Sequence, residues 1–157
     1  MLEWKLHVEV EARAPQPPAL LFDVVMDFEN APKRFRWITR VEKYTPGPVR
    51  VGTELIQFMS FYGMRKRALI TIDALEAPNL CALSVNDGTR THRQSVRFDA
   101  RDDGTAIKVV ADSGFGLLGA LVMPFTKKSA MLRCEDYIHD LVAAAETIEG
   151  GGQATAG

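Results

Sequence analysis

The sequence has few cysteines, no long apolar run and almost no net charge, and each absence excludes a class of protein. Its two cysteines, Cys81 and Cys134, lie far apart in apolar surroundings and form no CxxC motif, so we expect buried thiols in a reducing compartment and no disulfide. No run of about 18 apolar residues occurs, which argues against a membrane-spanning helix. Residues 1–12 alternate apolar and charged side chains where a signal peptide needs an apolar run. We therefore expect a cytoplasmic protein.

The charge is too balanced for a general attraction to polyanions. A formal net charge of −1 and a pI near 6.3 give no global attraction to nucleic acid, so we expect no nucleic-acid partner. The motifs HExxH and GxSxG do not occur, and no spacing of cysteine and histidine fits a metal site. We therefore expect neither a bound metal nor a cofactor.

The chain is organised around a long amphipathic segment, residues 124–146. This segment contains no glycine, and its apolar residues recur at three- and four-residue spacings, which predicts one helix with a buried face. The predicted buried face comprises Met131, Cys134, Ile138, Leu141 and Ala145. The opposite face would carry Lys127, Lys128, Arg133, Glu135, Asp136 and Asp140. At about 1.5 Å per residue the helix would span roughly 34 Å, enough to cross a small domain.

The residues before this helix alternate in short segments, which predicts strands. Residues 2–13 place Leu6 and Val8 on an apolar face opposite charged side chains, as in a half-buried strand. A proline-rich turn then starts a first helix, and a second short helix begins near Asn30. Six further alternating segments are separated by turn signals, which predicts an antiparallel meander. They cover residues 40–44, 51–61, 64–76, 80–85, 91–100 and 105–111.

These elements predict an α+β fold in a single domain. A length of 157 residues suits one domain with its own core. The order is one strand, two short helices, six strands and one long helix, which gives a seven-stranded antiparallel sheet covered by the C-terminal helix. We expect the domain to comprise residues 1–147 and the glycine-rich remainder, residues 148–157, to form a disordered tail.

Four local stretches appear in this order and are distinctive together. They are VEVEARAPQPPALLFDVVMDFENAPKRF, then Trp37 just before the second strand, then PGPVRVGTEL, and finally LLGALVMPFTKKSAMLRCEDYIHDLVAAAE. In these stretches the chain resembles the START-like or Bet v 1-like superfamily (SRPBCC), and within it the polyketide cyclase/dehydrase and lipid-transport type, over residues 3–146. The resemblance implies a helix-grip fold, in which a curved sheet wraps around the long helix with a hydrophobic cavity between them. It also implies a hydrophobic or amphipathic small-molecule ligand, since members include lipid carriers, hormone receptors and polyketide aromatase/cyclases.

Polar side chains on the strand 91–100 are the first candidates for a ligand site. Val96 and Phe98 define its inward face, and the two-residue period places Gln94 and His92 on the same face. Buried polar groups need partners or a ligand. On one interpretation, Gln94 and His92 orient a carbonyl or hydroxyl of a ligand in an apolar pocket. On the other, His92 lies in water at the strand end and Gln94 bonds a neighbour across the sheet.

Two further stretches are candidates for the cavity wall. Phe58 and Tyr62 lie in a hairpin that is apolar on both faces, which indicates a pocket rim, a partner surface or a buried hairpin. The glycine-rich residues 114–119 form either a gate over the cavity or a bulged strand end before a kinked helix. Basic residues form either a rim for an acidic head group or a solvated face: Lys33, Arg34, Arg36, Arg65, Lys66 and Arg67. The predicted ligand contacts are Phe58, Tyr62, Lys66, His92, Gln94, Val96, Phe115, Leu118, Val122, Met131, Cys134 and Ile138.

Three functions are compatible with this pattern. The first is a binding module that holds a lipid-like or polyketide-like molecule between the sheet and the long helix. The second is an enzyme that cyclises or dehydrates a polyketide-type intermediate, with Gln94, His92 or Tyr62 positioning an enolate oxygen or moving a proton. The third is a protein-docking module built on the aromatic hairpin. No titratable residue is paired by spacing with a base or nucleophile, which favours the binding module.

Overall fold

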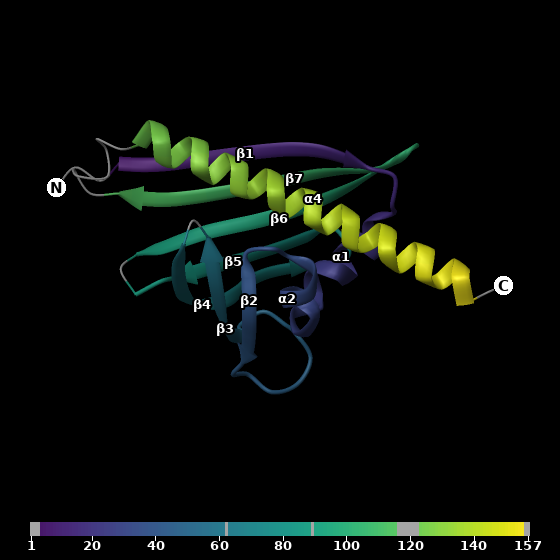
Figure 1. Ribbon diagram of the computed structural model, residues 1–157, viewed down its shortest axis with the longest axis horizontal. Coiled ribbons are helices and arrows are strands. Elements are labelled where there is room, and N and C mark those ends of the chain that lie inside the picture. The colour runs from purple at the N-terminus through teal and green to yellow at the C-terminus, as the bar shows by residue number, and fades with distance from the viewer. Residues whose placement is uncertain (1–3, 62, 89, 116–122, 156–157) are drawn as a thin grey trace.

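The structure is a computed structural model that describes residues 4–61, 63–88, 90–115 and 123–155 (Figure 1). Its elements follow the predicted order of one strand, two short helices, six strands and a long helix. They are β1 (Trp4–Ala14), α1 (Pro18–Met26), the 3₁₀ turn η1 (Phe28–Asn30), α2 (Ala31–Arg34), β2 (Ile38–Lys43), β3 (Glu54–Phe61), β4 (Met64–Glu76), β5 (Leu80–Asn86), β6 (Thr91–Arg101), β7 (Gly104–Phe115) and α4 (Met123–Thr155). The α+β class and the helix-grip arrangement are confirmed.

All strands belong to one antiparallel sheet of seven strands in the order β1-β7-β6-β5-β4-β3-β2. Strands β2 to β7 each pair with the next in sequence, and β1 closes the order by pairing with β7, with Val10 opposite Val109. The first strand, β1, therefore forms one edge of the sheet with the last strand, β7, beside it, and β2 forms the other edge. The helices α1 and α2 connect these two edges, and α4 lies across the face of the curved sheet (Figure 1).

The two-residue period of the strands places their apolar side chains under α4. Leu6 and Val8 of β1 are buried and pack against Ala130 and Cys134 of the helix. On β7, Ile107 and Val109 are buried, and β4 buries Ala68, Ile70 and Ile72 in the same way. The apolar faces predicted from alternation in β1 and β6 are therefore the faces that form the core.

The helix α4 buries a different face near its start from the one predicted. Ile138, Leu141 and Ala145 are buried in the core, as expected. Met131, assigned to the buried face, is 36% exposed, so that assignment is wrong. The first turns of α4 turn Ala130 toward the edge strand β1, and Met131 lies about 100° further round the helix.

The helix α4 also continues past the end of the predicted domain. The sequence predicts a disordered tail from residue 148, whereas the helix runs to Thr155. Helix propagation adds one hydrogen bond for each residue that is fixed, and a long preformed helix provides the nucleus. Residues 146–151 are exposed and contribute nothing to the core, which ends at Ala145. Among the described helices, including α4, none has both the length and the apolar character needed to cross a membrane.

Candidate functional site

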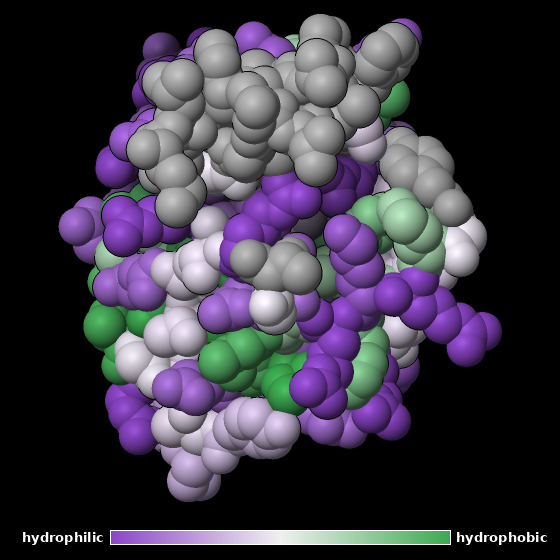
Figure 2. All heavy atoms as spheres, turned by 90° about the vertical axis from the view of Figure 1, so that its left-hand side faces the viewer, coloured by the Kyte–Doolittle hydropathy of each residue, from purple (hydrophilic) through white to green (hydrophobic). Residues whose placement is uncertain are grey.

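A cavity of about 600 Å³ lies between the sheet and α4. Pockets for small molecules usually measure about 300–1,000 Å³ and are mostly apolar with a few polar groups. The wall is predominantly apolar and is contributed by all seven strands, by α1, η1 and α2, and by α4. Its apolar residues include Val25, Phe28, Phe35, Ile38, Met59, Ile70, Leu83, Val85, Val96 and Val109. Figure 2 shows the end of the molecule where β6 begins, and hydrophilic side chains gather there beside hydrophobic ones.

The cavity exists because the inward side chains of β7 become small toward its end. Ile107 fills the core and the buried Val109 borders the cavity, whereas Ala111 and Ser113, the next two inward positions, are small and line the cavity. On the neighbouring strand β6, the inward positions before Val96 hold the polar residue Gln94 and then His92. A two-residue period thus continues from the core into the cavity, and only the size and polarity of the side chains change.

His92 is the titratable group in a polar cluster at this end of the cavity. Its Nδ1 hydrogen-bonds the hydroxyl of Ser113, and its Nε2 lies 3.6 Å from a carboxylate oxygen of Asp87. Burial lowers the pKa of His92; Asp87 opposes this shift, and the charges of Arg90 and Arg133 add to it. The imidazole is therefore mainly neutral at pH 7, and its two ring nitrogens face Ser113 and Asp87.

We expect His92 and His7 to titrate on opposite sides of 6.5, the ordinary histidine pKa. His7 lies outside the cavity, where hydrogen bonds to Asp112 and Glu9 raise its pKa. Protonated His7 therefore stabilises the fold below pH 6.5, and this contribution is lost as the pH rises through its folded pKa. His92 has the opposite sign, because protonating it below its unfolded pKa is disfavoured in the folded state.

An NMR titration of the histidine ring protons measures both pKa values in one experiment. Asp112→Asn should move the pKa of His7 back toward 6.5 and leave that of His92 in place. A pKa of His92 above that of His7 in the unmodified protein would contradict the expected environments.

A second polar group, Asp140, ties α4 to the segment after α2. The Arg36 backbone N–H donates to Oδ2 of Asp140 at 2.9 Å, and its side-chain NH2 donates to Oδ1 at 2.8 Å. Burial alone would raise the pKa of Asp140, but these hydrogen bonds outweigh it and lower the pKa. One turn earlier on α4, Tyr137 stacks on Phe35 with ring centres 4.7 Å apart. Asp140 is thus ionised and already paired, and its role is to hold the cavity wall together.

The structure places five of the twelve predicted contact residues in the cavity wall: Lys66, His92, Gln94, Val96 and Cys134. Ile138 is buried in the core and does not line the cavity. Phe58 lies on the opposite face of β3, where the guanidinium of Arg40 is 4.2 Å from its ring centre. Met131 is partly exposed and also outside the cavity. Tyr62, Leu118, Val122 and the side chain of Phe115 fall outside the described residues.

Among the residues that it describes, the structure does not show the cross-sheet hydrogen bond that was one interpretation of Gln94, nor the open-water position that was one interpretation of His92. Gln94 faces the cavity, and its amide makes no hydrogen bond to any other described residue. His92 does not lie in open water, because its side chain is only 22% exposed and contacts Ser113 and Asp87. Both side chains therefore line the cavity.

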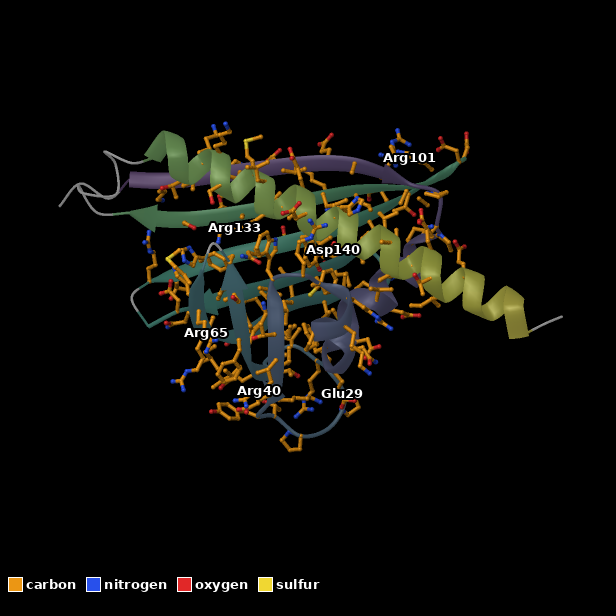
Figure 3. The ribbon with its side chains drawn as sticks, in the orientation of Figure 1. Glu29, Arg40, Arg65, Arg101, Arg133 and Asp140 are labelled. Carbon is orange, nitrogen blue, oxygen red and sulfur yellow. The ribbon has the colours of Figure 1, made fainter. Side chains whose placement is uncertain are left out.

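Sequence reasoning missed several residues of the wall. Ser113 lies two alternating steps beyond Val109 on β7, so the two-residue period could have predicted that it faces inward. Arg133 and Asp140 were assigned to the solvent face of α4, yet both line the cavity, and that assignment is wrong. Figure 3 labels both residues along the edge of α4 that is nearer β5 and β2. The helical pattern assigned them to solvent because they are charged. A cavity, unlike a packed core, can accommodate charged side chains.

The two cysteines do not provide a reactive thiolate. Burial raises the pKa of Cys81 to about 12 and also raises that of Cys134. Both thiols are free in the structure and protonated at neutral pH, so neither is poised as a nucleophile. Within the described residues, no group of three or more histidine, cysteine, aspartate or glutamate side chains could hold a metal ion.

Comparisons with known proteins agree with this architecture. Residues 5–146 match the family described as polyketide cyclase / dehydrase and lipid transport. No curated protein sequence gives a significant match.

Several solved structures share the fold. The Zhui aromatase/cyclase from a Streptomyces species has 14% identity and a TM-score of 0.76, with 91% of this chain and 94% of that chain covered. TTHA0849 from Thermus thermophilus has 15% identity and a TM-score of 0.78, with coverage of 91% and 99%. Ara h 8.0201 has 20% identity and a TM-score of 0.69, with coverage of 92% and 99%. At these identities the likeness concerns the fold alone.

Proposed function

The chain belongs to the polyketide cyclase / dehydrase and lipid transport family, and on that basis we propose that it binds a hydrophobic or amphipathic small molecule between the sheet and α4. The observation that carries the proposal is the cavity of about 600 Å³ with its mostly apolar wall. Burying apolar surface contributes roughly 25 cal/mol per Å², and the few polar groups then orient the ligand. A lipid-like or polyketide-like molecule meets both requirements, and the reduced cysteines suit a cytoplasmic site for this binding.

Native mass spectrometry of protein purified without detergent tests this proposal. We expect a stoichiometric apolar adduct that can be extracted and identified. If the protein is purified empty, it should bind the neutral apolar fluorophore N-phenylnaphthylamine. Ala111→Trp should weaken binding strongly, because the indole would project from β7 and occupy part of the cavity.

The matched control is Val110→Trp, which places the same ring on the opposite face of β7 and should leave binding intact. Equal binding by both tryptophan variants would contradict a ligand site between the sheet and α4. So would an empty protein that does not bind the fluorophore at all.

A polyketide cyclase or dehydratase is the second candidate function, and the His92 cluster supports it. A neutral imidazole facing an apolar cavity can remove a proton from carbon beside a ketone and return it to a departing hydroxyl, which leaves as water. Incubation with a linear poly-β-keto thioester should then give a cyclic product. His92→Phe should remove turnover while the protein still binds the substrate. A wild-type protein that binds this substrate and leaves it unchanged would contradict the enzymatic alternative.

A further inference from the structure

Two cationic side chains from different elements approach the same aromatic ring in the cavity wall. The Nζ of Lys66 on β4 lies 5.7 Å from the ring centre of Phe61, and the guanidinium carbon of Arg133 on α4 lies 4.9 Å from it. All three residues line the cavity. The face of an aromatic ring attracts a cation, but it supplies no hydrogen-bond acceptor and no negative charge.

The carboxylates of the cavity wall are engaged elsewhere. Asp140 is paired with Arg36, and Asp87 lies beside His92. Among the described residues, no carboxylate is within ion-pairing distance of Lys66 or Arg133. The Nε of Arg133 is buried and has no hydrogen-bond partner within the described part of the chain.

This arrangement is unfavourable without a compensating anion. The buried Nε of Arg133 lacks an acceptor among the described residues, which is costly, whereas Lys66 is an exposed residue whose ammonium reaches solvent as well as the cavity. A guanidinium presents a planar fork that matches the two oxygens of a carboxylate or the oxygens of a phosphate. One anionic oxygen group between Arg133 and Lys66 would satisfy both cations.

The rest of the cavity is suited to an apolar body. Along α4, Asp140 lies about 10 Å beyond Arg133, and its charge is already compensated by Arg36. Between these two positions on α4 lies Tyr137, whose ring stacks on Phe35, and Val96 of β6 also lines the cavity. The cavity is thus cationic near Arg133 and apolar or neutral beyond it.

We propose that the ligand is an amphipathic anion whose carboxylate or phosphate group binds between Arg133 and Lys66, with its apolar body directed toward Phe35 and Tyr137. This inference rests on the proposed function and adds the charge of the ligand to it. Only Lys66, of the six basic residues considered as a rim from the sequence, lines the cavity. The second cation comes instead from the long helix.

Calorimetric titration with ligands of one chain length tests the inference. The probes are decanoate, decyl phosphate, decanol and decyltrimethylammonium, all below their micellar concentrations. We expect decanoate or decyl phosphate to bind at least about tenfold more tightly than decanol, and the cationic probe to bind most weakly. The tighter of the two anions identifies the head group as carboxylate or phosphate. Added salt should weaken binding of the anions and leave decanol unaffected.

Charge-removing variants then locate the head group. Arg133→Gln and Lys66→Gln should each reduce the affinity for the anionic probe about tenfold and leave that for decanol unchanged. Arg133→Lys should retain part of the preference, since it keeps the charge and loses the fork. The matched controls are Lys128→Gln on the exposed side of α4 and Arg65→Gln on β4, because neither residue lines the cavity.

The outcomes separate this inference from the proposed function. Equal affinities for decanoate, decyl phosphate and decanol, unchanged by Arg133→Gln, would overturn the anionic head group and leave a cavity for neutral ligands. Failure of all four probes to bind a folded protein would contradict both proposals. Loss of decanol binding together with anion binding in Arg133→Gln would show a packing role for Arg133 and would also overturn the inference.

Discussion

Leu141→Asp should lower the free energy of unfolding by about 4 kcal/mol or more, because it places a charge without a partner in the core. Leu141 is fully buried, and it belongs to the core cluster that α4 forms with the sheet and α1. Domains are stable by only about 5–15 kcal/mol in total, so the variant should unfold at a much lower urea concentration or fail to fold. Urea unfolding followed by circular dichroism measures the difference.

Met131→Asp is the matched control on the same helix. Met131 is 36% exposed, so the new carboxylate remains in contact with water, and the unfolding free energy should change by only about 0.5 kcal/mol. The sequence alone had placed both residues on the buried face. Comparable losses for the two variants would show that Met131 is buried after all and that the helix is rotated from its position in the structure.

Gly104→Ala should be the second strongly destabilising change, with a cost of about 3 kcal/mol or more. Gly104 opens β7 with φ +139°, and a Cβ there would lie 2.1 Å from the backbone oxygen of Ala14 and 2.8 Å from the Cα of Pro15. These atoms belong to the backbone of the adjacent strand β1 and the turn that follows it, so they cannot rotate away as a flexible side chain would.

The close approach at Gly104 helps to join the first and last strands of the sheet. Beside it, the hydroxyl of Thr105 donates a buried hydrogen bond of 2.7 Å to the backbone oxygen of Gln16. A displaced β1 would lose this bond along with part of the ladder to β7. The expected loss of stability therefore comes from the pairing of the edge strand β1 with β7.

Gly52→Ala separates the steric contact from backbone strain. Gly52 also has a positive φ, +90°, but a Cβ there would meet nothing within 4 Å. Its substitution should cost about 1 kcal/mol, the penalty of the left-handed conformation alone. Thermal unfolding of the two variants side by side gives the comparison. If Gly52→Ala were as destabilising as Gly104→Ala, the contact with Ala14 would not be the cause.

The order of the elements and the inward faces of the main strands follow from the amino-acid pattern. Alternation over residues such as Ala68, Ile70 and Ile72 is a local property, since side chains two apart on a strand point the same way wherever the strand lies. The same period led correctly from Phe98 and Val96 to Gln94 and His92. The long helix was equally clear, because its apolar residues repeat at helical spacing over several turns.

Alternation could not choose a face where both faces are apolar. Phe58 and Phe61 are three residues apart on β3, so they must lie on opposite faces of the strand. Phe61 lines the cavity and Phe58 lies under Arg40 outside it. Nothing in the hairpin itself distinguishes the two, and only the pairing of β3 with its neighbours and the position of α4 decided which ring faces the cavity.

The tertiary structure alone decided which charged residues of α4 belong to the site. A helical pattern divides residues into apolar and polar faces, and it assigns a charged residue to solvent because burying an unpaired charge is costly. Where a cavity is present, a charged residue need not face the outer solvent, since its side chain can line the cavity without entering a packed core. Asp140 faces inward because Arg36, 104 residues earlier, compensates its charge. Arg133 faces inward beside the Phe61 ring, and neither contact can be read from positions so distant in sequence.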